Sequence, residues 1–361
     1  MEGLVVMPEF WEGKRVLITG HTGFKGVWAT RLLVHLGAEV HGLALPPDSD
    51  PSLFAMLGEE GLTSSTLGDM TDHEAVAHTV SEVQPQFVLH MAAQPLVRRS
   101  YREPVETFAT NVMGTVHLLD SLREQDGVEA VLVVTTDKVY ENKQDEGAFT
   151  ESDRLGGYDP YAASKVAVEV ATAAFDLSYF SANGVPLATA RAGNVIGGGD
   201  FSEDRLIPDI VRAEMEGVPL KLRNPQATRP WQHVLDCLAG YFFYIQALSE
   251  GRDMPHSLNF GPTSPEDNLT VAQMQETFSS IFGADQNWER DVAAAPREMD
   301  TLAINADMAQ RLLGWNSCYS PLQAIRLTAE WYRAWRDGAD PLSLLDAQIA
   351  SFVKLVGKFT R

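Results

Sequence analysis

The sequence predicts an α/β protein in which a doubly wound parallel sheet is combined with a smaller mixed C-terminal domain. Through residue 192, short apolar runs alternate with longer amphipathic stretches, which is the pattern of a parallel sheet with helices on both faces. A glycine-rich turn also lies between the first apolar run and the first amphipathic stretch. Sheets of this kind bind ligands outside the carboxyl ends of their strands, so the residues that follow each strand are examined first.

The elements follow in order along the chain. Strands are expected over residues 15–19, 39–44, 87–91, 130–135 and 186–192, and helices over 26–36, 73–83, 105–123 and 161–180. After about Asn194 the segments are rich in loops, and helices are expected over 271–282, 305–313 and 321–336. We therefore expect a dinucleotide-binding domain of residues 1–193 and about 231–262. Residues 194–230 and about 263–361 are expected to form a substrate-binding domain.

Composition excludes several classes of partner. The chain has 361 residues, a net charge of −21 and a pI of about 4.7, which argues against nucleic acid or an anionic membrane as the main partner. Its two cysteines, Cys237 and Cys318, are far apart and show no metal-ligand spacing. We expect no metal and no disulfide framework, and a reducing cytoplasmic location fits best.

The glycine-rich turn "GHTGFKG" spans residues 20–26 and has the pattern G-x-x-G-x-x-G. Between a strand and a helix, such glycines let the backbone approach a pyrophosphate that faces the helix N-terminus. The alternative is a plain tight turn with packing glycines. The context favours a dinucleotide site, to which we assign these residues: Gly20, Thr22, Gly23, Phe24, Lys25 and Gly26.

The choice between NAD and NADP depends on the end of the second strand. An acid that marks NAD would fall near Ala44, and none is there. Between Val40 and Leu62 there is also no Arg or Lys to hold a 2′-phosphate, so NAD is favoured. Asp69 follows a third expected strand and is interpreted either as a ligand of the adenine amine or as a turn aspartate.

"YDPYAASK" places Tyr161 and Lys165 four residues apart on one face of a helix. A nearby ammonium group and a positive nicotinamide ring favour the phenolate and lower the pKa of the tyrosine. Tyr161 is then able to take a hydroxyl proton while hydride leaves the adjacent carbon. The alternative is a pair of solvated or packing residues.

"VLVVTTDKVY" ends a strand with Thr135, Thr136, Asp137 and Lys138. Thr136 is a candidate to hydrogen-bond the reacting oxygen, and Asp137 and Lys138 add an acid and a base beside it. The alternative is a helix-capping Thr-Asp pair.

At this point the sequence resembles the extended short-chain dehydrogenase/reductases that act on nucleotide sugars, and most closely the CDP-glucose 4,6-dehydratases. The resemblance implies a Rossmann-type sheet and extends over residues 20 to about 261, with "GW" at 314–315 fitting the tail of the family. The matching segments are "GHTGFKG", "HMAAQPLVRRSY", "TTDKVYEN", "YDPYAASK", "RAGNVIGGGD", "DRLIPD", "RPWQHVLDCLAGY" and "NFGP".

The resemblance implies a reaction without net redox change. NAD oxidises C4 of the glucose unit of CDP-glucose, water leaves from C5 and C6, and hydride returns to C6 to give a 4-keto-6-deoxy sugar for deoxysugar and lipopolysaccharide or other polysaccharide precursors. Tyr161 takes the O4 proton, Lys165 binds the nicotinamide ribose, Thr136 positions O4, and Asp137 protonates the departing hydroxyl. Lys138 stands where the dTDP-glucose enzymes have a glutamate. It is either the neutral base for the C5 proton or a cation that stabilises the enolate.

Further roles follow from the same resemblance. The expected cofactor contacts, besides those of the glycine turn, are Asp69, His90, Ala92, Ala93, Asn111, Thr135, Tyr161 and Lys165. The expected substrate contacts are Gln94, Asn194, Arg205, Leu206, Arg229 and Asn259. The apolar faces of helices 105–123 and 161–180 predict a homodimer through a four-helix bundle.

Two alternatives stay open from the sequence. One is a C4 epimerase, or a 4,6-dehydratase for another nucleotide sugar, that shares Tyr161 and Lys165. The Asp137–Lys138 pair favours dehydration, because a C4 epimerase needs no acid for C6. The other is a non-catalytic, cofactor-sensing regulator, which the retained Tyr161–Lys165 pair disfavours.

Overall fold

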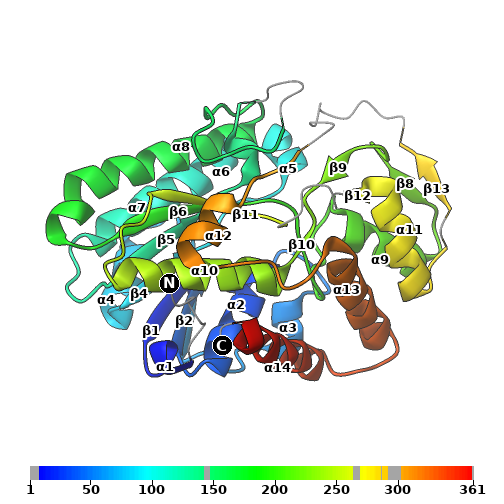
Figure 1. Ribbon diagram of the computed structural model, residues 1–361, viewed down its shortest axis with the longest axis horizontal. Helices are drawn as coiled ribbons and strands as arrows, with labels where there is room; N and C mark the ends of the chain where they lie inside the picture. The colour runs from blue at the N-terminus through cyan, green and yellow to red at the C-terminus, as the bar shows by residue number, and fades with distance from the viewer. Residues whose placement is uncertain (1–7, 142–146, 263–268, 286, 292–301, 360–361) are drawn as a thin grey trace.

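Seven parallel strands form the sheet at the centre of the protein (Figure 1). The computed structural model describes residues 8–141, 147–262, 269–285, 287–291 and 302–359. The strand order reverses between β1 and β4, so a crevice opens outside the carboxyl ends at that point. In order of pairing the strands are β11 (Ser257–Phe260), β6 (Leu187–Ala192), β5 (Ala130–Val134), β4 (Phe87–His90), β1 (Arg15–Thr19), β2 (Glu39–Ala44) and β3 (Ser64–Leu67). The predicted fold class is confirmed.

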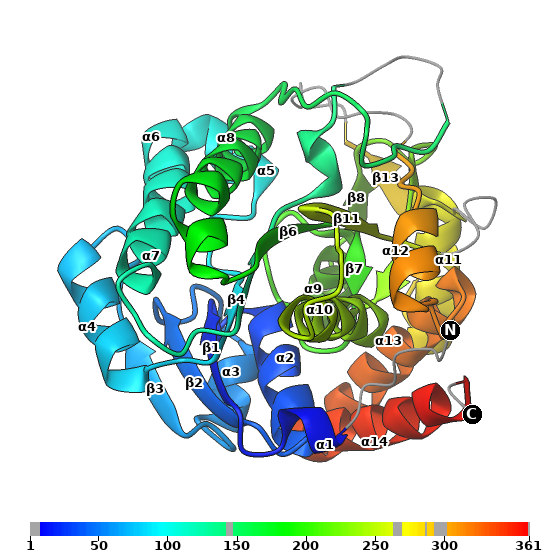
Figure 2. The same ribbon diagram turned by 60° about the vertical axis from the view of Figure 1, so that its left-hand side comes forward.

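Helices cover both faces of the sheet, as Figure 2 shows. Alternate strand residues enter separate cores, so that Leu17 packs on one face while Val16 and Ile18 pack on the other. On the Leu17 face lie α4 (His73–Val83), α7 (Gly114–Leu122) and α8 (Pro160–Phe175). On the other lie α2 (Phe24–His35) and α10 (Val234–Ser249). Helix α10 is apolar on nearly every side and is buried along almost its whole length.

A second group of short elements lies beyond one end of the sheet, on the right of Figure 1. Helices α9 (Leu206–Glu216) and α13 (Pro321–Arg336) both pack against α11 (Val271–Phe282). Strand β8 (Leu220–Leu222) pairs with β13 (Trp288–Arg290), and β9 (Thr228–Arg229) pairs with β12 (Leu269–Thr270). Strand β7 (Val195–Ile196) pairs with β10 (Gln232–His233). These elements form the far wall of the crevice.

The C-terminal helices return to the sheet. Helix α12 (Asp307–Leu313) contacts α10 and β11, and α14 (Pro341–Phe359) contacts α2 and α3 (Leu53–Leu57). An ion pair of 2.9 Å between Arg31 of α2 and Asp346 of α14 supports this packing. The division into a dinucleotide-binding and a substrate-binding domain stays a prediction. Helices α12 and α14, which fall within the predicted substrate-binding domain, pack against elements of the predicted dinucleotide-binding domain. None of the described helices is long and apolar enough to span a membrane.

The predicted helix 105–123 is interrupted in the structure. It consists of α6 (Pro104–Phe108), a π-helical segment (Ala109–Met113) and α7, while α8 is followed by a second π-helical segment (Asp176–Phe180). The first π segment holds Asn111, whose side-chain amide donates to Ser164 Oγ at 2.8 Å and to the Gln94 carbonyl at 3.2 Å. Predicted helices 73–83, 271–282 and 321–336 coincide with α4, α11 and α13.

Candidate active site

A cavity of about 2570 Å³ lies outside the carboxyl ends of the strands. Single ligand pockets usually measure ~300–1,000 Å³, so this one has room for a dinucleotide and a second ligand. Its wall contains every residue predicted to contact cofactor or substrate except His90, Asn111 and Asn259. All five predicted catalytic side chains are in that wall: Thr136, Asp137, Lys138, Tyr161 and Lys165.

The glycine turn fits a pyrophosphate. A side chain at Gly26 would place its Cβ 2.1 Å from the Gly20 carbonyl oxygen, and one at Gly20 would meet the Ala92 nitrogen at 2.8 Å. Gly20 also has a φ of +79°, which favours glycine. Gly23, the N-cap of α2, is exposed, and no side-chain cap satisfies the N–H groups of the first turn. This helix N-terminus therefore presents amide donors to an anion in the cavity.

The loop after β2 lines the other end of the part of the cavity in which the cofactor is expected. Ala44 is followed by a proline-containing loop that lines the cavity, and Thr22 Oγ1 donates to the Leu45 carbonyl at 2.8 Å. Asp69 also lines the cavity, while its carboxylate accepts from the Thr71 N–H at 2.8 Å. Both interpretations of Asp69 are compatible with this position. It begins a turn, since its carbonyl accepts from the Asp72 N–H at 3.1 Å, and it lines the cavity where adenine is expected.

Tyr161 and Lys165 are positioned by the start of α8. Asp159 caps this helix by accepting from the Ala162 N–H at 2.8 Å, and Pro160 occupies its first turn. Both functional side chains are buried, and Lys165 Nζ donates to the Val134 carbonyl at 3.1 Å. Burial, together with the charge of Lys25, lowers the pKa of Lys165 to about 8.

The pKa of Tyr161 differs from the sequence-based expectation. Burial raises it to about 12, while a hydrogen bond with Thr136 and the charge of Arg205 act in the opposite direction. The Lys165 ammonium group, which was expected to lower this pKa, donates its hydrogen bond to the Val134 carbonyl. The groups that favour the phenolate are thus Thr136 and Arg205, and the second comes from the far wall.

Asp137 has the environment of a carboxylic acid. It is 2% exposed, and burial raises its pKa. Thr136 Oγ1 donates to Oδ1 at 3.1 Å, whereas Oδ2 has no hydrogen-bond partner among the described residues. Gly193 leaves room for this buried oxygen, because a Cβ at that position would lie 3.0 Å from Oδ2. Lys138, the next residue, lines the cavity and is half-buried.

A buried ion pair fixes the strand that carries these residues. Glu169 of α8 and Arg191 of β6 pair at 2.8 Å, with side chains only 3% and 6% exposed. Thr135 donates to Glu169, which places the hydroxyl of this predicted cofactor ligand toward the core. Its backbone remains in the cavity wall, so β5, β6 and α8 are held together directly behind the reacting groups.

His90, Asn111 and Asn259 lie behind the wall. His90 is hydrogen-bonded to Thr19 at 2.6 Å, and burial lowers its pKa to about 3, so the ring is neutral. Asn111 accepts from the Gln94 N–H at 2.7 Å. Asn259 in β11 accepts from the Tyr140 hydroxyl at 2.6 Å. Asn111 and Asn259 support Gln94 and Tyr140, which do line the cavity, whereas the partners of His90, Thr19 and Thr115, lie outside the wall. The predicted direct contacts of all three are not seen in the wall.

Sequence reasoning missed most of the polar groups of the far wall. The segment 221–229 contributes Lys221, Arg223, Asn224 and the predicted Arg229 to the cavity, and β13 contributes Arg290. The alternating basic residues of "KLRNPQATR" are a signal that was available. It was not used, because a short strand and its loop look like a solvated surface when their partners are unknown. The wall therefore has a basic lining suited to a phosphorylated ligand.

A Rossmann-type sheet with a glycine turn and a Tyr–Lys pair on one helix defines a short-chain dehydrogenase/reductase of the extended class. Residues 17–328 match the family model described as GDP-mannose 4,6 dehydratase, and the chain belongs to this family. The CDP-glucose 4,6-dehydratase of Salmonella typhimurium is 41% identical over 355 residues, covering 97% of this chain and 99% of that protein. The dTDP-glucose 4,6-dehydratase of Xanthomonas campestris pv. campestris is 30% identical over 89% and 95% of the two chains.

Solved structures show the same fold. The dTDP-glucose 4,6-dehydratase from Bacillus anthracis in complex with NAD has a TM-score of 0.75 at 22% identity, covering 91% of this chain and 100% of that one. The dTDP-glucose 4,6-dehydratase from Streptomyces venezuelae, with NAD bound, has a TM-score of 0.75 at 26% identity, with coverages of 91% and 99%. The predicted resemblance is confirmed.

Proposed function

We propose that this protein is an NAD-dependent CDP-glucose 4,6-dehydratase, a hydro-lyase that forms CDP-4-keto-6-deoxy-D-glucose and water. One observation carries the proposal. The wall of a single cavity contains Thr136, Asp137, Lys138, Tyr161 and Lys165. An epimerase would need the tyrosine but not a buried carboxylic acid. The full-length similarity to the Salmonella typhimurium CDP-glucose 4,6-dehydratase supports the substrate assignment.

The residues of the glycine turn and α8 hold the cofactor. NAD supplies a hydride acceptor for C4 of the sugar and, once reduced, the hydride donor for C6. Gly20, Gly23 and the N-terminus of α2 bind its pyrophosphate, and Lys165 binds the nicotinamide ribose.

Tyr161 removes the O4 proton as the C4–H bond breaks. Thr136 holds O4 beside it, and Arg205 and Thr136 offset the burial that raises the pKa of the tyrosine. A positive nicotinamide ring adds further stabilisation of the phenolate. The proton stays on the Tyr161 hydroxyl during elimination and is released to solvent before the next turnover, because C4 is still a carbonyl in the product.

Asp137 and Lys138 perform the elimination. The C4 carbonyl acidifies the C5 proton, which Lys138 removes and returns to C5 when C6 takes the hydride, while Asp137 donates a proton to the departing C6 hydroxyl. The raised pKa of Asp137 keeps this carboxyl group protonated at a pH where an exposed aspartate is ionised. The buried, unpartnered Oδ2 is the atom from which this proton is delivered.

The basic far wall binds the substrate diphosphate. Arg205, Arg229 and Asn194 all line the cavity. Paired N–H donors of arginine match phosphate oxygens well. The interior hydrogen bonds of Asn259 place it behind this half, so we assign it a supporting role.

The protein forms a homodimer through α6–α7 and α8. Large apolar side chains are exposed on these helices and on the two π-helical segments next to them: Val105 is 83% and Leu177 79% exposed, and Phe108, Met113, Val170 and Tyr179 are also at the surface. Such a patch on two adjacent helices suits a self-complementary interface. Val105→Glu combined with Leu177→Glu should yield monomers by light scattering, whereas Leu322→Glu, on α13, should not. A wild-type monomer at micromolar concentration contradicts the interface.

We also propose that the protein is located in the cytoplasm. Its product would serve deoxysugar biosynthesis for polysaccharide precursors. Both cysteines are free among the described residues, which suits a reducing compartment. Cell fractionation with an antibody to the chain tests the location.

Incubation with CDP-, dTDP-, UDP- and GDP-glucose tests the function. A 4-keto product from CDP-glucose, detected by its alkali-induced absorbance and by the mass loss of one water, is expected at the highest kcat/KM. Tyr161→Phe is the matched inactive control. Preference for another base would contradict the substrate assignment, and a C4 epimer without loss of water would contradict the reaction.

A further inference from the structure

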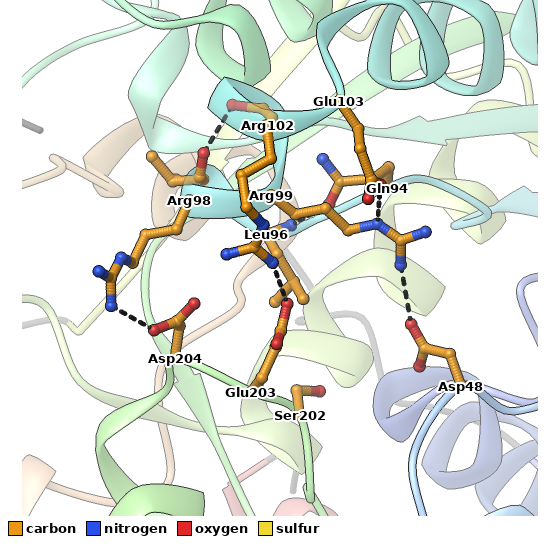
Figure 3. A network of polar contacts seen from close by, with 12 residues as sticks. Asp48, Gln94, Leu96, Arg98, Arg99, Arg102, Glu103, Ser202, Glu203 and Asp204 are labelled. Atoms are coloured by element: carbon orange, nitrogen blue, oxygen red, sulfur yellow. Dashed lines mark hydrogen bonds and ion pairs between the residues drawn. The ribbon is translucent and has the colours of Figure 1, made fainter.

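Helix α5 (Val97–Arg102) holds a loop of the far wall by two ion pairs (Figure 3). Arg98 Nη1 lies 2.7 Å from Asp204 Oδ1, and Arg102 Nη2 lies 2.8 Å from Glu203 Oε1. The two acids belong to the segment 200–205, which precedes α9. These contacts therefore cross the cavity from the sheet to the substrate side.

The helix that holds this loop is itself fixed to the catalytic helix. The Ser100 side chain is fully buried, and its hydroxyl accepts from the Tyr161 N–H at 3.1 Å. Any group bound to α5 is thus held at a set position relative to Tyr161.

Asp204 is the point at which the loop turns toward the cavity. Its φ is +58°, its carbonyl accepts from Arg223 Nη2 at 3.1 Å, and Arg205 follows as the N-cap of α9. Arg205 also pairs with Asp200 at 3.4 Å and lines the cavity. The position of the Arg205 guanidinium therefore depends on how Asp204 is held.

Exposure decides which contact of α5 matters most. The Arg98 and Asp204 side chains are 34% and 21% exposed, whereas those of Arg102 and Glu203 are each 54% exposed. A third contact, from Arg99 to Asp48 in the loop after β2, is longer at 3.3 Å, and Asp48 is 75% exposed. Exposed ion pairs contribute little, so the Arg98–Asp204 pair is the effective one.

We propose that Arg98 and Asp204 are positioning residues for the substrate half of the cavity: their ion pair holds segment 200–205 against α5 and places Arg205 where it binds the substrate diphosphate. This inference rests on the proposed function, because it takes a sugar nucleotide as the ligand of that half. Neither residue touches the reacting atoms. Their loss should weaken nucleotide binding and leave cofactor binding unchanged.

The test compares Asp204→Asn with Asp48→Asn, which removes the same charge on the cofactor side. Asparagine tolerates positive φ, so Asp204→Asn keeps the backbone of the loop. Binding of CDP, dTDP, UDP and GDP to the full chain is measured by calorimetry, and the variants are then titrated with the nucleotide that wild type binds most tightly. NAD⁺ is titrated in parallel. Arg98→Met and the variant that carries both substitutions complete a double-mutant cycle with Asp204→Asn.

Asp204→Asn and Arg98→Met should each raise the Kd of the nucleotide by about 3- to 5-fold, the upper end for a partly exposed ion pair. The double variant should bind the nucleotide no more weakly than the single variant with the higher Kd. The Kd of NAD⁺ should stay within twofold of the wild-type value. Asp48→Asn should leave nucleotide binding within twofold. Unchanged nucleotide binding in Asp204→Asn, or equal losses for nucleotide and NAD⁺, overturns the inference. A wild-type protein that binds none of the four nucleotides instead overturns the proposed function, and the inference with it.

Discussion

Replacement of Asp137 by asparagine separates the two halves of the proposed reaction. Asparagine keeps the shape of the side chain and still accepts a hydrogen bond from Thr136, but it has no proton to transfer. General acid catalysis contributes about 10²–10⁴-fold. Because Asp137 is 2% exposed, water cannot replace its proton readily, and we expect the upper half of that range, ~10³–10⁴-fold or about 4–5.5 kcal/mol in activation free energy.

Single-turnover absorbance of the reduced nicotinamide measures this effect. In Asp137→Asn, C4 oxidation should proceed at nearly the wild-type rate, and the reduced cofactor should accumulate because water loss is slow. A 6-deoxy-6-fluoro substrate, whose leaving group needs less protonation, should be affected much less than the natural one. Equal losses on both substrates would show that Asp137 is not the acid.

The pH dependence of the same step follows from the raised pKa of Asp137. A raised pKa keeps the acid form to higher pH, so the rate of water loss should fall as pH rises through that pKa. The alkaline decline due to this group should be absent from Asp137→Asn. If the same alkaline decline persists in Asp137→Asn, another group titrates there and the assignment of Asp137 as the acid is refuted.

Three further predictions follow from the structure. Tyr161→Phe should slow C4 oxidation by about 10²–10⁴-fold while NAD⁺ affinity and the circular dichroism spectrum stay unchanged, and a rate within a few-fold of wild type would contradict its role. Lys138→Met should stop exchange of the C5 proton with solvent deuterium while C4 oxidation stays detectable. Lys138→Arg should be equally inactive, since arginine cannot act as a base, and an active arginine variant would favour the enolate-stabilising role. Glu169→Gln leaves Arg191 charged in the core and should lower the free energy of unfolding by about 3–5 kcal/mol in urea; a loss under 1 kcal/mol would refute this account.

The sheet and the reacting groups were predictable because local patterns specify them. Apolar runs bounded by turns marked β1, β2, β4, β5 and β6, and the carboxyl ends of parallel strands must lie at one edge. The spacing of Tyr161 and Lys165 placed both on one face of α8 without knowledge of the fold. These features depend on residues close together in the chain, where periodicity and turn chemistry act.

The supporting contacts depend on residues that are distant in the chain. The hydrogen bond from Tyr140 to Asn259 joins positions 119 apart, and the Arg98–Asp204 pair joins positions 106 apart. The need for glycine at position 193 arises because Pro230 and Asp137, both distant in the chain, approach it. The interior position of Asn259 and the shift of the Tyr161 pKa likewise result from burial, which one sequence does not reveal.

The most direct test of the account is the fate of the C4 hydrogen. If the cofactor bound by the glycine turn takes hydride from C4 and returns it to C6 within one cavity, CDP-glucose labelled with deuterium at C4 should give a product with deuterium in its C6 methyl group. In deuterated water, unlabelled substrate should acquire solvent deuterium at C5. A product whose methyl group lacks the C4 label, or a labelled sugar that is epimerised without losing water, would contradict the central claim.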